Sequence, residues 1–351
     1  MKELKILKDI FLSNFNFSKP YKLTFVITYI CHYRCVHCSI WMKKPKNELS
    51  LDEISEFSKK YPNFKWFNLT GGEPFLRRDI VDIVKVLKEN SYSPLLFNTT
   101  TNGFSPSYIY DKIKEILKFK IPKLITVVSL DGYKELHESI RGIPGSFDRA
   151  LETFLLLKNL SKEHRNFRTY FGYTLSHFNV GNFIKTFLKV KEVIKDITLD
   201  DFHLNIYHTS AHYYSNVNEM LKKEEEIKSE LEKIISLKPV IRTNPINFID
   251  NVYLKNALKY LRTNKTPFSC KALTSSLFID SFGNVYPCTI WGLPLGNLRE
   301  NDYDLNKILS SEKIRMLKMK IRCLKCPNCW TPCEAYQTIM GNLLYLPRKL
   351  L

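Results

Sequence analysis

The chain has 351 residues, a length typical of about two domains. Hydrophobic residues make up 44% of it and charged residues 25%, an ordinary globular composition that excludes a disordered or fibrous protein. The formal net charge of +18 favours an acidic partner, such as nucleic acid or a phosphorylated or carboxylated substrate, but a solvated lysine-rich surface explains it equally well.

Short apolar runs alternate with amphipathic helical patterns between residues 20 and 210. The first helix opens at Ser50 and Glu53, which form a capping-box pattern. Strands are predicted at 22–28, 64–70, 95–100, 123–130, 168–175 and 200–207. Helices are predicted at 50–61, 77–90, 106–118, 147–160 and 181–195. This alternation makes roughly six β-then-α units and predicts a parallel sheet, open or partly closed into a barrel.

The pattern changes after residue 210. A charged amphipathic helix is predicted at 216–238, and the proline-containing stretch 239–269 is predicted to be a connection. From Cys270 the chain is short, basic and rich in cysteine, with a predicted hairpin formed by 276–280 and 284–286. We therefore divide the chain into a first domain, a helical linker and a small second domain, at 1–212, 213–269 and 270–351.

The sequence contains no membrane-spanning pattern. No run approaches the roughly 20 apolar residues that a span needs. The N-terminus lacks the apolar core of a signal peptide, so we expect a cytoplasmic protein.

The nine cysteines fall into two groups separated by most of the chain. A disulfide scaffold is disfavoured because the chain is long, its apolar content is high and the cysteine count is odd. Close spacings in a reducing compartment favour metal ligation instead. The candidate metal ligands are Cys31, Cys35, Cys38, Cys270, Cys288, Cys323, Cys326, Cys329 and Cys333.

The first group has the spacing C-x3-C-x2-C on a loop that follows a predicted strand. Three thiolates on one loop can hold three irons of a [4Fe–4S] cluster and leave one iron for an outside ligand. The alternatives are a zinc site with His32 or His37 as the fourth ligand, and unrelated buried cysteines.

This first half of the chain resembles the radical S-adenosylmethionine (SAM) superfamily. The cysteine spacing is matched by Leu69-Thr-Gly-Gly-Glu-Pro74 at the end of the second strand, and by Thr-Asn-Gly, Ser-Leu-Asp-Gly and His-x3-Arg-Gly motifs farther on. The resemblance implies a partial (βα)6 barrel in which the open iron binds SAM. The residues that it implies around SAM are Gly71, Gly72, Glu73, Asn102, Ser129, Asp131 and Arg141, the last pairing with the SAM carboxylate. A turn cap at Asp131 and a surface ion pair at Arg141 are the simpler alternatives.

The second group is similar to the SPASM and twitch extensions of the same superfamily. Cys270 and Cys288 flank Gly283 with the opening spacing of those extensions. The later run has gaps of two, two and three residues and no cysteine after Cys333, so the group has six cysteines where the full pattern has seven. The resemblance implies one or two auxiliary [4Fe–4S] clusters, with Cys333 joining Cys270 and Cys288. A zinc ribbon is the alternative.

These features together predict a radical SAM oxidoreductase or maturase with auxiliary iron–sulfur chemistry. The resemblance implies a reductant such as ferredoxin or flavodoxin, and a peptide or small-molecule substrate, for which the net charge favours an acidic group. Nucleic acid is not expected as a partner. The rival class is a zinc-stapled, basic nucleic-acid-binding protein, in which the Gly-Gly-Glu and Ser-Leu-Asp-Gly motifs would have no role. The sequence identifies no catalytic acid or base.

Overall fold

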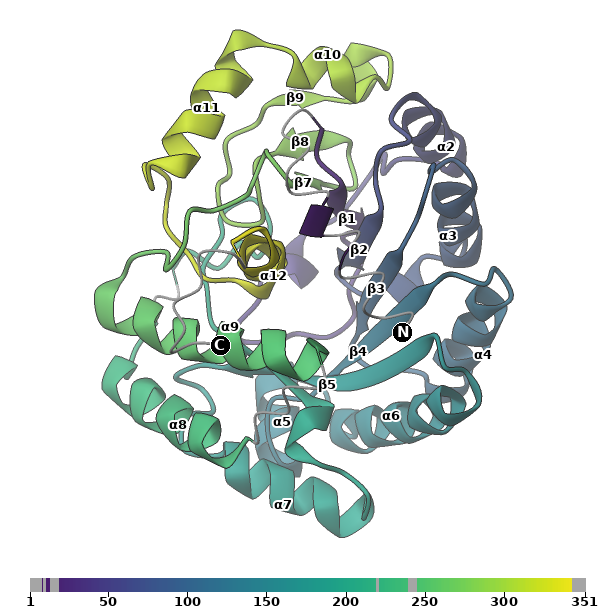
Figure 1. Ribbon diagram of the computed structural model, residues 1–351. Helices are drawn as coiled ribbons and strands as arrows, with labels where there is room; N and C mark the ends of the chain where they lie inside the picture. Colours follow the sequence, from purple (N-terminus) through teal and green to yellow (C-terminus); the bar gives the residue numbers. More distant parts are fainter. Residues whose placement is uncertain (1–7, 9–10, 13–18, 219–220, 239–244, 343–351) are drawn as a thin grey trace.

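A sheet with six parallel strands and helices on its outer side forms the first part of the computed structural model (Figure 1). The structure describes all residues except 1–7, 9–10, 13–18, 219–220, 239–244 and 343–351. The parallel strands are β1 (Lys22–Thr28), β2 (Trp66–Gly71), β3 (Leu96–Thr101), β4 (Lys123–Ser129), β5 (Phe167–Leu175) and β6 (Phe202–Ile206). The helices between and after them are α2 (Leu51–Lys60), α3 (Ile80–Glu89), α4 (Pro106–Leu117), α5 (Lys134–Arg141), α6 (Ser146–Glu163) and α7 (Phe183–Val193).

The second part of the chain extends the same sheet. Strand β7 (Ser276–Ile279) pairs in parallel with β1, so that Lys22 lies opposite Ser276. Strands β8 (Asn284–Tyr286) and β9 (Gly296–Asn297) follow antiparallel, which gives a nine-stranded sheet in the order β6-β5-β4-β3-β2-β1-β7-β8-β9. The turn between β7 and β8 needs a glycine because Gly283 has a φ of +85°. The remaining helices are α8 (Glu224–Leu237), α9 (Pro245–Thr263), α10 (Leu305–Leu309), α11 (Glu312–Arg322) and α12 (Pro332–Gly341).

Two predictions about the middle of the chain were wrong. The stretch 239–269 is not only a connection, because α9 occupies Pro245–Thr263. Its apolar residues recur every three or four positions, and proline is compatible with the first position of a helix. The helix predicted at 216–238 begins only at Glu224, and residues 219–220 lie outside the described residues. Among the described residues, no helix is both long and apolar enough to cross a membrane.

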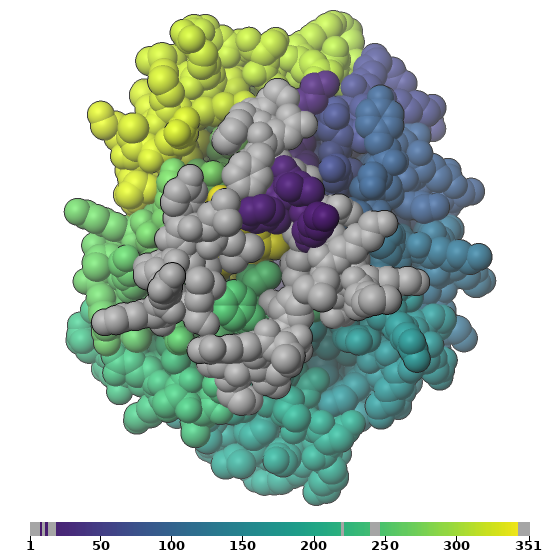
Figure 2. Space-filling view, in the orientation of Figure 1, coloured from purple at the N-terminus to yellow at the C-terminus, as the bar shows by residue number. Residues whose placement is uncertain are grey.

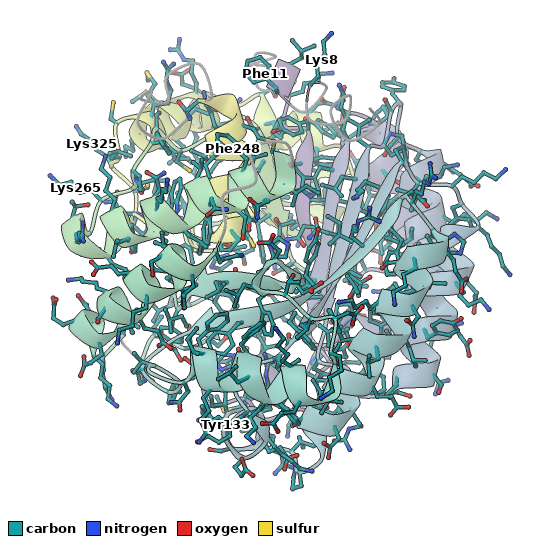
Figure 3. All side chains as sticks on the ribbon, turned by 60° about the horizontal axis from the view of Figure 1, so that its bottom comes forward. Lys8, Phe11, Tyr133, Phe248, Lys265 and Lys325 are labelled. Atoms are coloured by element: carbon teal, nitrogen blue, oxygen red, sulfur yellow. The ribbon has the colours of Figure 1, made fainter. Side chains whose placement is uncertain are left out.

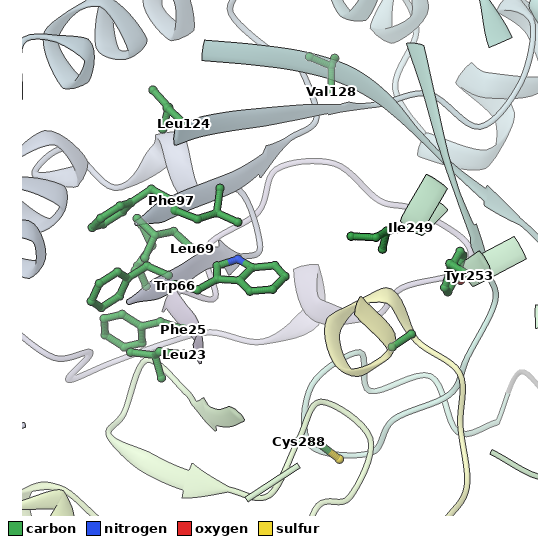
Figure 4. Close-up of a cluster of buried hydrophobic side chains, with 14 of the residues drawn as sticks. Leu23, Phe25, Trp66, Leu69, Phe97, Leu124, Val128, Ile249, Tyr253 and Cys288 are labelled. Atoms are coloured by element: carbon green, nitrogen blue, oxygen red, sulfur yellow. The ribbon is translucent and has the colours of Figure 1, made fainter. Parts of the chain in front are cut away.

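The core fills the space between the sheet and its helices, while the inner side of the sheet faces a cavity. All seven residues of β1 are buried, as expected for a strand covered on both faces. In Figure 4, Phe25 and Phe97 lie among the outer, helix-facing side chains, whereas Trp66 points inward. Ile249 of α9 points toward Trp66 from the other side of the cavity. Helices α9 and α12 therefore close the side of the barrel that the six strands leave open (Figure 1).

A buried lysine connects the two parts of the molecule. The Lys22 amine donates to the Gln337 side chain at 2.8 Å and to the Cys333 carbonyl, both on α12. It also lies 4.3 Å from the centre of the Trp66 ring. Burial lowers the pKa of Lys22, against the nearby acidic Glu334 and the thiols, which raise it. The start of β1 is thus fixed to α12, the helix that contains Cys333.

An ion pair at the surface makes a second connection between the two parts. The Arg299 guanidinium donates to both carboxylate oxygens of Glu53, at 2.6 and 2.8 Å, and the Tyr303 hydroxyl adds a third hydrogen bond. Chiefly because of the Arg299 hydrogen bonds, the pKa of Glu53 falls from 4.5 to about 2. The stabilisation is therefore fully present above pH 4.5 and is lost as the pH falls toward 2.

We expect Glu53→Gln to lower the free energy of unfolding at pH 7 by about 1 kcal/mol, because solvent screens a partly exposed pair. Thermal unfolding followed between pH 3 and 7 checks this: the variant should lose less stability than the parent on acidification. Glu56→Gln is the matched control, since Glu56 pairs only with Lys60 of its own helix. A pH profile of Glu53→Gln parallel to that of the parent would contradict the prediction.

Candidate active site

A cavity of about 400 Å³ lies on the inner side of the sheet, enclosed by the strands, α9 and α12. One end is formed by the carboxyl ends of β1 to β4, where ligands commonly bind to parallel sheets. The predicted residues that line this end are Cys31, Cys35, Cys38, Gly71, Gly72, Glu73, Asn102, Ser129 and Arg141. The other end includes the first residues of the same four strands, Lys22, Trp66, Leu96 and Lys123.

The loop that carries Cys31, Cys35 and Cys38 follows β1 directly and is held by backbone hydrogen bonds. The Arg34 and Val36 amides donate to the carbonyls of Arg141 and Ile140, at the end of α5. Burial raises the pKa of the Cys31 and Cys38 thiols to about 12. Ionised thiolates in this loop therefore need a positive charge nearby. A bound metal supplies that charge, and the thiols lose their protons when they bind it.

The two glycines of the Gly-Gly-Glu motif allow the cysteine loop to pass close to β2. A Cβ on Gly71 would lie 2.1 Å from the Thr28 carbonyl oxygen. A Cβ on Gly72 would lie 2.3 Å from the Ile30 carbonyl oxygen and 2.8 Å from the Cβ of Cys31. Any larger residue would push the cysteine loop away from the sheet, so these glycines are required by the protein's own packing as well as by their place in the cavity wall.

Glu73 links the ends of β2 and β3. Its carboxylate accepts hydrogen bonds from the Thr101 hydroxyl at 2.9 Å and from the Asn102 and Phe75 amides at 2.7 and 3.2 Å. Burial raises the pKa of Glu73 to about 7, although these hydrogen bonds oppose the rise. Most acceptor positions of Glu73 are occupied within the protein, so its first effect is to hold the cavity wall in shape.

Arg141 stands between the cysteine loop and Asp131. Its guanidinium lies 2.5 Å from an Asp131 carboxylate oxygen and donates to the Cys35 sulfur at 3.7 Å. Asp131 is buried behind Arg141, outside the cavity lining, and the His37 ring lies 4.0 Å from it. Burial opposes ionisation of Asp131, but Arg141 and His37 keep its pKa lowered. The surface ion pair considered for Arg141 is wrong, because the pair is buried.

Among the described residues, at least two buried donors at this end of the cavity have no hydrogen-bond partner. They are the side-chain Nδ2 of Asn102 and the Nε of Arg141. An unpaired buried donor costs about 1–3 kcal/mol, so a native protein normally pairs it with a ligand or water. A carboxylate is a chemically suitable acceptor for both groups. The donor set, beside three thiols, therefore fits a cluster with a carboxylate-bearing ligand such as SAM.

A second, smaller cavity lies between the hairpin and α11. It is lined by Cys270, Cys288, Cys326 and Cys329, together with Glu334 and Ile321. Burial raises the pKa of Glu334 to about 7, and one of its carboxylate oxygens has no hydrogen-bond partner. Four thiols are the usual protein ligand set of a [4Fe–4S] cluster. The space between them is only about 20 Å³, so these side chains must open outward to admit such a group.

The structure separates the other two cysteines from this group. Cys333 lines the large cavity, where its sulfur accepts a hydrogen bond from the Asn68 amide at 3.7 Å. Cys323 is exposed at the end of α11. Among the described residues, no three His, Cys, Asp or Glu side chains converge closely enough to hold a single metal ion.

A polar segment that follows β6 and includes residues 212–216 lies between the two cysteine groups, and no sequence motif marks it. The Asn216 side chain donates to the His37 carbonyl at 3.1 Å, and the His212 ring lies 3.1 Å from the Cys288 carbonyl. Tyr213 hydrogen-bonds Thr70 in the cavity wall at 2.6 Å. No local pattern indicates these contacts, because each joins positions far apart in the chain.

Family models match both parts of the chain. A model described as the radical SAM superfamily matches residues 25–190, and a model described as SPASM, an iron–sulfur cluster-binding domain, matches residues 270–333. On a partial barrel with a cysteine-rich extension, these matches define the class of protein. The chain belongs to the radical SAM superfamily and carries a SPASM domain.

This membership confirms the fold class predicted from the sequence. The radical SAM domain implies a [4Fe–4S] cluster bound with SAM, and the SPASM domain implies auxiliary iron–sulfur.

Curated relatives match only part of the chain. The GTP 3′,8-cyclase of Yersinia pestis is 30% identical over 151 residues, which are 38% of this chain and 44% of that protein. A probable GTP 3′,8-cyclase of Saccharolobus islandicus is 33% identical over 140 residues, which are 39% of this chain and 43% of the relative. The matches thus span less than half the length of these relatives.

Solved structures match over most of the chain. Native anSMEcpe with bound AdoMet has a TM-score of 0.59 at 14% identity, covering 93% of this chain and 98% of that chain. Streptococcus suis SuiB bound to S-adenosylmethionine has a TM-score of 0.57 at 14% identity, covering 86% and 68%. At this identity the likeness establishes the fold.

Proposed function

We propose that the protein is a radical SAM enzyme that acts on a peptide or a small molecule. With a [4Fe–4S] cluster on Cys31, Cys35 and Cys38, one electron would break a carbon–sulfur bond of SAM. This would release methionine and give a 5′-deoxyadenosyl radical that abstracts hydrogen from the substrate. One observation carries the proposal: three thiols and two unpaired buried donors, Asn102 Nδ2 and Arg141 Nε, surround the same end of one cavity.

Some side chains of the cavity are proposed to bind SAM directly, and others hold those side chains in place. Asn102 and Arg141 would donate to its carboxylate, Ser129 would offer a hydroxyl in the cavity wall, and Glu73 holds the ends of β2 and β3 together. Asp131 is a positioning residue, since it acts on Arg141 from outside the cavity. Gly71 and Gly72 pack directly against the chain that leads into the cysteine loop, and this close contact holds the loop in position beside β2.

The far end of the cavity is the proposed substrate site. It contains the aromatic rings of Trp66 and Tyr336 and two buried cations, Lys22 and Lys123. Aromatic walls exclude water from a reacting carbon, and buried lysines favour a substrate with an acidic group. A peptide substrate is supported by the likeness to Streptococcus suis SuiB, which was solved bound to the precursor peptide SuiA.

The second cavity is the proposed auxiliary site, with Cys270, Cys288, Cys326 and Cys329 as ligands. These four thiols line one small space, whereas Cys333 faces the large cavity and Cys323 faces solvent. This assignment differs from the pattern implied by the SPASM resemblance, which pairs Cys333 with Cys270 and Cys288. The proposed role of the site is to exchange single electrons with the substrate or with a partner.

Anaerobic reconstitution with iron and sulfide tests the proposed function. We expect a brown protein with visible sulfur-to-iron absorption that forms 5′-deoxyadenosine and methionine from SAM when dithionite is added. Stoichiometric zinc without iron, together with tight binding of single-stranded RNA, would support the rival nucleic-acid-binding class instead.

We expect Arg141→Met to weaken SAM binding about tenfold, because it removes a charge-assisted hydrogen bond worth about 1.5–3 kcal/mol. Isothermal titration of the reconstituted protein with SAM measures the dissociation constant. Arg165→Met is the control, because Arg165 is exposed and does not line the cavity. Iron content is measured on both variants, because Arg141 also contacts Cys35. An unchanged dissociation constant would count against Arg141.

A further inference from the structure

The outer face of α11 forms a basic patch with an apolar centre. Exposed residues recur along it at spacings of three and four, so they share one side of the helix. We define the α11 patch by six exposed residues, Lys313, Arg315, Met316, Met319, Lys320 and Arg322. Met316 and Met319 are 46% and 47% exposed, a high value for apolar side chains. The one acidic residue of the helix, Glu312, pairs with Arg315.

The inner face of the same helix forms a wall of the auxiliary site. Ile314, Leu317 and Ile321 are buried, and Ile321 lines the small cavity beside the four cysteines. An α-helix with its side chains is about 10 Å across. A molecule seated on the α11 patch would therefore be separated from the auxiliary site by roughly the thickness of one helix.

Further lysines widen the positive surface around the auxiliary cysteines. Lys325 precedes Cys326 and is exposed, and Lys265 is also exposed. Both project outward on the same side of the molecule (Figure 3). In the space-filling view, the yellow-green surface of α10 and α11 forms the upper left and upper edge of the molecule (Figure 2). The patch is thus directly accessible from solvent.

The composition of the patch indicates the chemistry of its partner. Methionine and arginine are enriched in protein interfaces, and exposed methionines adapt to different partner surfaces. Charges of one sign around such a centre steer a partner of opposite charge. Single-stranded nucleic acid usually requires aromatic side chains on which bases stack, and α11 contains none. These features favour an acidic protein over RNA.

We propose that the α11 patch is the docking surface for an acidic one-electron carrier protein that serves the auxiliary site. This inference rests on the proposed function, because the docked carrier exchanges electrons with the proposed auxiliary site. The partner's acidic groups contact the basic residues of the patch and the neighbouring Lys325. These basic residues are Lys313, Arg315, Lys320 and Arg322. The partner's apolar contact surface packs against Met316 and Met319.

The test compares two variants that each lose four positive charges. The patch variant carries Lys313→Gln, Arg315→Gln, Lys320→Gln and Arg322→Gln. The control variant carries Lys85→Gln, Lys114→Gln, Lys118→Gln and Lys120→Gln, at exposed positions on and beside α3 and α4. An acidic flavodoxin is the probe, and its dissociation constant is measured by calorimetry at salt concentrations from roughly 0.02 to 0.3 M.

We expect the patch variant to bind flavodoxin about tenfold more weakly than the parent, with a flatter salt dependence, and the control variant to stay within about twofold. Met316→Ser with Met319→Ser should weaken binding without changing the salt dependence. With flavodoxin as reductant, the electron would enter at the auxiliary site and pass from there to the cluster on Cys31, Cys35 and Cys38, where SAM is cleaved. 5′-Deoxyadenosine formation should therefore slow in the patch variant, whereas with dithionite, which needs no docking, it should match the parent.

Equal weakening in the patch and control variants would overturn the proposal, since net charge alone would then explain binding. Parental affinity in the patch variant would overturn it too. So would patch-dependent binding of a single-stranded RNA without saturable binding of flavodoxin. A failure of the proposed function is distinguishable, because it would abolish 5′-deoxyadenosine formation with dithionite in the parent, whereas the binding measurement needs no turnover.

Discussion

Changing Cys31, Cys35 and Cys38 to alanine is expected to abolish SAM cleavage while the C-terminal part of the protein keeps its iron. The three thiols lie on one loop at the end of β1, and with Arg141 and Asn102 they surround the proposed SAM site. Loss of all three leaves no protein ligand for the cluster that supplies the electron. The auxiliary thiols lie in a separate cavity and are untouched by the change.

Production of 5′-deoxyadenosine with dithionite measures this effect, and iron is counted on the same anaerobic sample. We expect no product above background and about four irons per chain in the triple variant. Cys323→Ala, at an exposed position, is the control and should cleave SAM at the parental rate. Undiminished 5′-deoxyadenosine formation by the triple variant would refute the assignment of these three cysteines.

The second large effect concerns the ligands of the auxiliary site. In the triple-alanine background, Cys270→Ala combined with Cys288→Ala is expected to remove essentially all remaining iron. Both thiols line the small cavity, and two thiols are too few to retain a cluster of four irons. Iron counting and electron paramagnetic resonance of the reduced protein measure the loss. Unaltered helical circular dichroism would show that the protein remains folded.

A matched pair of single variants separates the two possible ligand sets. In the same background, Cys326→Ala should lower the iron content strongly, whereas Cys333→Ala should leave about four irons per chain, because Cys333 faces the other cavity. The pattern implied by the SPASM resemblance gives the opposite result for Cys333, which would there be a ligand of the cluster. About eight irons per chain in the background protein would contradict a single auxiliary site.

The secondary structure of the first part could be predicted because its signals are local. The buried, mostly apolar run of β1 and the capping box at Ser50 and Glu53 each span only a few residues of the chain. The prediction is wrong at α9, because the prolines between 239 and 269 favour a connection where the structure has a helix. Its apolar residues do recur at helical spacing, and in the folded chain they pack against β6, α8 and α12.

The candidate site was predictable wherever one short motif carries the chemistry. The three spaced cysteines and Gly71-Gly72-Glu73 indicated the position of the proposed SAM site from residues adjacent in sequence, and they line one end of the cavity. The partners of Arg141 could not be predicted in this way. Its contacts with Asp131 and Cys35 depend on how α5 packs against the cysteine loop, and such packing follows no local period.

By itself, the sequence determined the alternation of strands and helices in the first part of the chain, the two cysteine groups and the superfamily to which they point. Only the tertiary structure decided which thiols share a cavity, that Lys22 joins β1 to α12, and that β7 extends the sheet beside β1. The physical reason is separation along the chain. Hydrogen-bond capacity and hydrophobic period are properties of a segment, whereas the distance between Cys288 and Cys329 is a property of the packed fold.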